Sequence, residues 1–175
     1  MQRTMYLVTL IALAGAVSAC GDTPSTPSTP TADSQVTYSA TLLPANEVPP
    51  VSGNEAAGSA TATLTFNLRK DGGGTTTAAT LDVTVNATGF PAGMTLTASH
   101  IHAGAAGSNG GVFVSLGLTA GEVTFATGSG SFSKRGVTLT VDQANAIMAN
   151  PGAFYLNIHT AANPDGVARG QLIPN

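Results

Sequence analysis

Cysteine and charge are both scarce in this chain of 175 residues. Its single cysteine, Cys20, has no second cysteine with which to form a disulfide within the chain, so packing must stabilise the folded part. Lys and Arg number six against nine Asp and Glu, and no basic run is longer than two residues. A surface that binds nucleic acid needs clustered positive charge. The sequence therefore predicts no nucleic-acid partner.

The chain also lacks an apolar run long enough to span a bilayer as a helix. Residues 5–17 are apolar, follow the basic Arg3, and end in Val17-Ser18-Ala19-Cys20. A short apolar core with these flanks is typical of an export signal, which we predict over residues 1–19. Small residues before a cysteine also resemble the lipobox of bacterial lipoproteins, so Cys20 is the expected lipidation site. The alternative is an ordinary secretory peptide whose removal leaves a free thiol.

Acyl chains on Cys20 would anchor the protein to a membrane without a transmembrane helix. Lipoproteins retained at the inner membrane typically carry Asp after the lipidated cysteine, whereas this chain has Gly21. We therefore expect a lipid-anchored protein of the bacterial cell envelope, at the outer membrane or the cell surface rather than the inner membrane.

Residues 20–35 are rich in Thr, Ser and Pro and poor in apolar side chains. Such a segment buries too little surface to offset the entropy lost on ordering it. We predict a disordered stalk, whose spaced prolines favour an extended form that holds the following domain about 40 Å from the lipid.

Residues 36–175 have a length that usually makes one domain, and their apolar residues recur with a period of two. The alternation is clearest in residues 60–69 and 81–88, which predicts two strands with one dry face each. The glycine-rich segment 70–74 between them predicts a hairpin. Further strands are expected at residues 36–43, 96–102, 112–116, 122–133, 154–160 and 167–173.

One helix interrupts the strands. Thr140 and Gln143 fit a capping box, and Pro151-Gly152 ends the helix after residue 150. About eight short strands and one short helix predict an all-β fold, either an antiparallel β-sandwich or a flattened barrel. A parallel α/β sheet would need far more helix.

All three histidines fall in two of the predicted strands. His100 and His102 alternate along one strand and thus share a face, and His159 lies on another strand. Three imidazoles with an open fourth position form a familiar copper or zinc site, so these residues are the candidate metal ligands. The parity of Leu96 opposes convergence, because alternation places this apolar residue on the face of His100. The alternative is that each imidazole hydrogen-bonds loop backbone and pins the segment 104–111.

No catalytic constellation emerges from the sequence. Ser99 is next to His100 but points to the opposite face of a strand, and Asp165, the carboxylate nearest to a histidine, falls in the predicted turn 163–166. We therefore expect no enzymatic activity. Glu47 and Arg169 are isolated charges in nearly neutral surroundings, and we predict a cross-strand ion pair between them.

Three blocks of the chain resemble the chordin-type domain, CHRD, of bacterial secreted proteins and animal chordins. They are Ala45-Asn46-Glu47-Val48-Pro49-Pro50-Val51, His100-Ile101-His102-Ala103-Gly104, and Phe154-Tyr155-Leu156-Asn157-Ile158-His159-Thr160 with the Asn-Pro-Asp-Gly and Arg-Gly-Gln-Leu that follow. The resemblance implies an all-β sandwich likened to the immunoglobulin and copper-zinc superoxide dismutase folds. A dismutase centre uses more histidines than the three present here, so dismutase activity is not expected.

Together these observations predict a cell-envelope lipoprotein that presents a CHRD domain as a binding or structural module. Its partner would be an extracellular or periplasmic protein, whose identity does not follow from the domain because function lies in sites rather than folds. The alternative is a copper- or zinc-binding protein that uses His100, His102 and His159.

Overall fold

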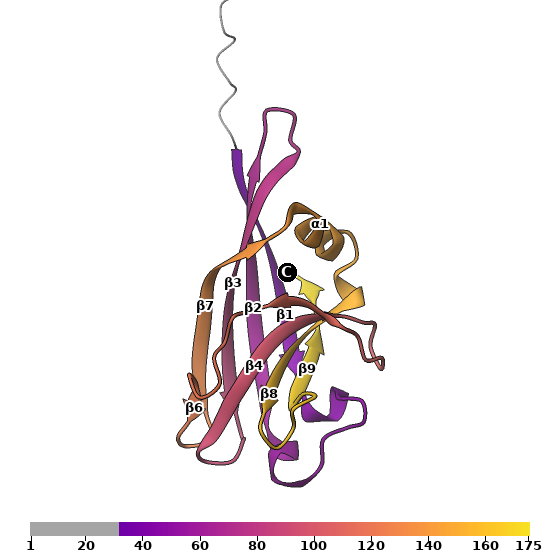
Figure 1. Ribbon diagram of the computed structural model, residues 1–175. Helices are drawn as coiled ribbons and strands as arrows, with labels where there is room; N and C mark the ends of the chain where they lie inside the picture. The colour runs from indigo at the N-terminus through magenta and orange to yellow at the C-terminus, as the bar shows by residue number, and fades with distance from the viewer. Residues whose placement is uncertain (1–31) are drawn as a thin grey trace, which may run out of the picture.

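The structure is a computed structural model that describes residues 32–175. The predicted signal peptide, Cys20 and most of the predicted stalk lie outside the described residues. Two antiparallel sheets pack face to face and carry one α-helix (Figure 1). The predicted antiparallel β-sandwich with one short helix is thus confirmed. Among residues 32–175, no helix combines the length and the apolar character that crossing a membrane requires.

The first sheet has the strand order β10-β1-β2-β3-β7. Its strands are β1 (Ala32–Leu42), β2 (Ser59–Lys70), β3 (Thr76–Thr88), β7 (Gly130–Leu139) and β10 (Ile173–Pro174). Along β2 and β3, buried residues alternate with more exposed ones through most of each strand, and the two strands pair antiparallel. The predicted hairpin is confirmed, since one face of each strand packs on the core and the other faces water.

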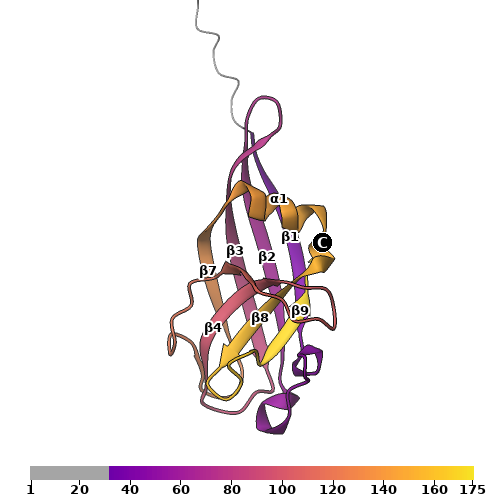
Figure 2. The same ribbon diagram turned by 45° about the vertical axis from the view of Figure 1, so that its right-hand side comes forward.

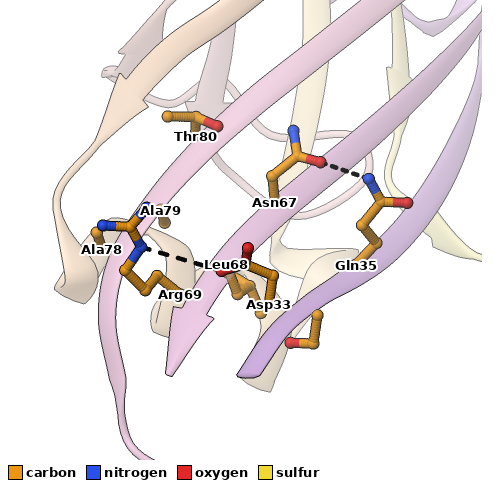
Figure 3. A pocket seen from close by; sticks show the side chains of 9 residues that line it. Asp33, Gln35, Asn67, Leu68, Arg69, Ala78, Ala79 and Thr80 are labelled. Carbon is orange, nitrogen blue, oxygen red and sulfur yellow. Dashed lines mark hydrogen bonds and ion pairs between the residues drawn. The ribbon is translucent and has the colours of Figure 1, made fainter. Parts of the chain in front are cut away.

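The first strand begins earlier than the sequence suggested. Residues 32–35, which we assigned to the disordered stalk, pair with β2, with Asp33 opposite Arg69 and Gln35 opposite Asn67. Backbone bonding to β2 orders this polar stretch, which its own side chains could not do. Residues 33–35 line a hollow of about 490 Å³, in which Gln35 Nε2 donates to Asn67 Oδ1 at 2.7 Å and Arg69 Nε lies 3.9 Å from Asp33 Oδ1 (Figure 3).

The second sheet has the order β5-β4-β8-β9, and β6 pairs with β4 beside this path. Its strands are β4 (Met94–Ala103), β5 (Val112–Ser115), β6 (Thr124–Phe125), β8 (Phe154–Thr160) and β9 (Ala168–Gln171). The predicted strand 122–133 is wrong, because it divides into β6 and β7. Gly128 turns the chain between them with φ 76°, and a Cβ there would lie 1.9 Å from the carbonyl oxygen of Phe90.

The helix α1 (Val141–Ala149) covers one end of the sandwich (Figure 2). Its predicted capping box is confirmed. The backbone N–H of Gln143 donates to Thr140 Oγ1 at 3.1 Å, and the backbone N–H of Thr140 donates to Gln143 Oε1 at 2.9 Å. Three 3₁₀ turns complete the fold, η1 (Pro44–Asn46), η2 (Gly53–Ala57) and η3 (Pro151–Ala153).

Strand β8 is buried along its whole length. Leu156 and Ile158 face the core between the sheets, but Tyr155, Asn157 and His159 alternate with them and are buried too. The core covers only one face of a strand, so loops must cover the other. The outer face of the second sheet is therefore a second buried region, and it is polar.

Candidate metal centre

A bulge in β4 turns the histidines away from the core. The pairing of β4 with β8 shifts between Leu96, which lies opposite Thr160, and Ala98, which lies opposite His159. Leu96 faces the core and is fully buried, yet the extra residue places Ala98 and His100 on the outer face. The parity objection drawn from Leu96 is therefore wrong, because strict alternation does not hold across the bulge.

The three histidines come together on this outer face. The ring centroid of His100 lies 4.9 Å from that of His159 and 5.6 Å from that of His102, and the centroids of His102 and His159 are 5.8 Å apart. His100 Nδ1 lies 3.1 Å from His159 Nε2. One nitrogen from each ring lies within 4.8 Å of the other two.

Loop carbonyls set the orientation of two rings. His102 Nδ1 lies 3.0 Å from the Gly110 oxygen, and His159 Nδ1 lies 2.9 Å from the Pro164 oxygen. A carbonyl only accepts, so each Nδ1 carries the proton and each Nε2 has the lone pair. At His159 this lone pair accepts from His100 Nδ1, a contact whose proton a bound ion would replace. The predicted backbone bonding of the imidazoles is thus observed for two of them, alongside their convergence.

His102 Nε2 is buried and has no hydrogen-bond partner among the described residues. A buried polar atom nearly always finds a partner. Metal-binding imidazoles show the same arrangement, in which one nitrogen donates to a carbonyl and the other is left bare for the ion.

The predicted ion pair between Glu47 and Arg169 is present and buried. Arg169 Nε donates to Glu47 Oε2 at 2.9 Å, and the two side chains are 4% and 5% exposed. It is not a cross-strand pair, because Glu47 follows η1 in a loop that covers the sheet. The other guanidinium nitrogens donate to Ser108 O at 2.9 Å and to Asn109 Oδ1 at 2.6 Å. Arg169 thus binds both the loop that carries Glu47 and the loop that carries Ser108 and Asn109.

Tyr155 links this ion pair to the histidines. Its ring stacks on His102 with an interplanar angle of 3° and a centroid distance of 5.0 Å, and the Arg169 guanidinium carbon lies 4.6 Å from its centre. Sequence reasoning named Tyr155 only as part of the third CHRD-like block and gave it no role in the site. It also gave the turn at Pro164 no role beyond chain reversal, since no side chain reveals that a backbone carbonyl orients His159.

Burial keeps the three imidazoles neutral at pH 7. Burial, with the nearby His159 and His102 adding to it, lowers the pKa of His100 to about 4. Burial also lowers the pKa of His102 and of His159, although the hydrogen bond each donates to a carbonyl opposes the shift. The neutral form is the one that binds metal ions.

A pocket of about 550 Å³ opens over the cluster. All three histidines line it, together with other residues of β4 and β8, the start of β5, and loop residues that lie over the sheet. A bound ion would therefore have open space on one side.

The fold and the site together define an antiparallel β-sandwich domain with a buried polar cluster on the outer face of one sheet. Residues 38–172 match the model of the CHRD domain family, and the chain belongs to this family. The predicted resemblance is thereby confirmed. No curated protein and no solved structure matches the chain.

Proposed function

We propose that this CHRD domain is a metal-binding module in which His100, His102 and His159 hold one copper or zinc ion. The bare, buried Nε2 of His102 carries the proposal. A backbone carbonyl holds Nδ1 of this ring, and no group among the described residues hydrogen-bonds its Nε2.

The spacing of the nitrogens supports one ion. Bonds of about 2.0 to 2.1 Å in a tetrahedral site place ligand nitrogens about 3.3 Å apart. His100 Nδ1 and His159 Nε2 are already 3.1 Å apart, and the other separations are at most 4.8 Å. His100 is the least buried of the three and donates to no carbonyl, so its ring is the one free to adjust. Three neutral imidazoles suit both copper and zinc.

The test is metal binding by the protein carrying Cys20→Ser and no affinity tag. We expect one zinc or copper ion per chain, and a loss of affinity of at least about 100-fold in His102→Ala, because three ligands become two. Affinity should hold as pH falls to about 6 and decline toward pH 4, where protons compete for the ligands. The lowered pKa values place this decline below that of ordinary histidines.

The variant with alanine at all three histidines separates function from structure. Loss of the ion with unchanged circular dichroism and melting temperature supports the metal site. Unchanged metal stoichiometry in this variant would contradict the proposal, and unfolding of a protein that is already metal-free would assign the histidines to loop bonding instead.

We further propose that the module is displayed on the cell envelope through lipid on Cys20, as a binding protein without catalytic activity. The export signal, the lipobox-like residues and the Thr/Pro segment support this. β1 enters at one end of the sandwich and the turn between β8 and β9, which carries Pro164, lies at the other (Figure 1). Labelled palmitate should enter the wild-type chain in the source bacterium and not Cys20→Ser; equal labelling would contradict lipidation.

A further inference from the structure

The mouth of the histidine pocket is apolar. Three large apolar side chains are exposed among residues 32–175, namely Val48 (37%), Val112 (57%) and Ile173 (56%). Val48 and Val112 both line this pocket, whereas Ile173 lies on β10 of the other sheet. Exposed apolar side chains that gather at one concave site mark a surface that binds an apolar group.

These apolar walls are held in place. Asn109 Nδ2 donates to the Val48 oxygen at 2.8 Å, and Asn109 is itself bound by Arg169. Val112 is the first residue of β5 and pairs with His102 of the neighbouring strand β4. Pro49 and Pro164 add rigid backbone to the rim. The pocket is therefore preformed, which lowers the cost of ordering it around a ligand.

The lining of the pocket brings one carboxylate and no Lys or Arg side chain. Besides the three histidines and the phenol of Tyr155, the one ionisable side chain that lines the pocket is the carboxylate of Asp165. Arg169 lies against Tyr155 and donates to Glu47, Ser108 and Asn109, so its charge is engaged outside the pocket. Apart from a bound ion, no positively charged side chain therefore lines the pocket, and the exposed valines are the feature that favours one ligand over another.

An ion held by three imidazoles keeps a fourth coordination position. His100, His102 and His159 all line the pocket, so this position is reached from the pocket itself. A ligand that fits must therefore offer one donor atom to the ion and an apolar flank to the valines.

We infer that the pocket binds a nitrogen heteroaromatic ring, of the azole or pyridine type, whose ring nitrogen would coordinate the ion while its carbon edge packs against Val48 and Val112. This inference rests on the proposed metal site. The ring could belong to a free heterocycle or to a histidine side chain of a peptide, and about 550 Å³ accommodates either.

The experiment uses the Cys20→Ser protein loaded with cobalt(II), whose visible absorption reports coordination. We expect 4-methylimidazole to change the spectrum saturably and to bind more tightly than azide. Val112→Ser should weaken 4-methylimidazole at least about three-fold by removing apolar contact and leave azide unchanged. Ile173→Ser, an equally exposed residue away from the pocket, is the matched control and should change neither.

The outcomes separate this inference from the metal site. Failure of cobalt to bind would remove the proposed metal site and the ring ligand with it. Cobalt binding without any response to 4-methylimidazole, or equal loss of both probes in Val112→Ser, would overturn the ring ligand alone. A blocked histidine amide that binds as well as 4-methylimidazole supports a peptide source, and one that does not bind supports a free heterocycle.

Discussion

Replacing Arg169 by methionine should lower the free energy of unfolding by about 3–5 kcal/mol. The substitution leaves the Glu47 carboxylate, which is 5% exposed, buried without its counter-charge. It also removes the donors that satisfy Ser108 O and Asn109 Oδ1, so the loop that carries these two residues loses its bonds to the guanidinium. Denaturant unfolding of the purified variant at pH 7 measures the loss.

The loss of stability in Arg169→Met should be smaller at acidic pH. Burial raises the pKa of Glu47, and Arg169 opposes this rise by charge and by hydrogen bonding. Without Arg169 the folded-state pKa of Glu47 rises further above its unfolded value. A group with a raised pKa favours folding below its unfolded pKa and loses that contribution as pH rises. We therefore expect Arg169→Met to be closer to wild type near pH 4.5 than at pH 7.

Two variants isolate the buried pair. Arg69→Met removes an exposed arginine that lies 3.9 Å from Asp33, and it should cost no more than about 0.5 kcal/mol. Adding Glu47→Gln to Arg169→Met removes the stranded charge, so the double variant should lose less stability than the two single losses together. Equal costs for Arg169→Met and Arg69→Met would contradict a structural role for the buried pair.

Replacing Gly110 by alanine should cost about 3 kcal/mol of stability and reduce metal affinity about ten-fold. A Cβ at this position would lie 1.6 Å from the Ala103 oxygen and 2.4 Å from its carbonyl carbon. Both are backbone atoms of β4, so the loop itself must move. The Gly110 carbonyl, which accepts from His102 Nδ1, moves with it. Denaturant unfolding and metal titration of one preparation measure both effects.

Gly111→Ala is the matched control. No heavy atom lies within 4 Å of a Cβ at this neighbouring position, so stability should change by no more than about 0.5 kcal/mol. Equal losses in the two variants would show that the close approach at Gly110 is not the cause.

The sequence predicted correctly those features of the structure whose physical causes lie between residues close together in the chain. The alternation in β2 and β3 follows from one buried and one wet face, and the capping box of α1 joins residues three apart. The pairing of Glu47 with Arg169 is a different case. The two residues are 122 positions apart in the sequence. The pair was predicted because isolated charges in a nearly neutral chain have few partners.

Predictions failed where a distant partner decides the outcome. Residues 32–35 form a strand because β2 offers them backbone partners, and the break between β6 and β7 depends on the close approach of Gly128 to Phe90. Neither cause is visible in the local composition. The bulge between Leu96 and Ala98 is likewise a property of the pairing with β8 rather than of β4 alone.

The amino-acid sequence by itself determined the fold class, the ends of the helix and the three histidines worth examining, because periodicity, capping and residue chemistry are carried by neighbouring positions. Only the tertiary structure decided that His100 and His102 lie beside His159, that loop carbonyls orient two of the rings, and that a pocket with two exposed valines opens over them. Strand register, a one-residue bulge and three covering loops bring these groups together. Each of these depends on contacts between segments far apart in the chain.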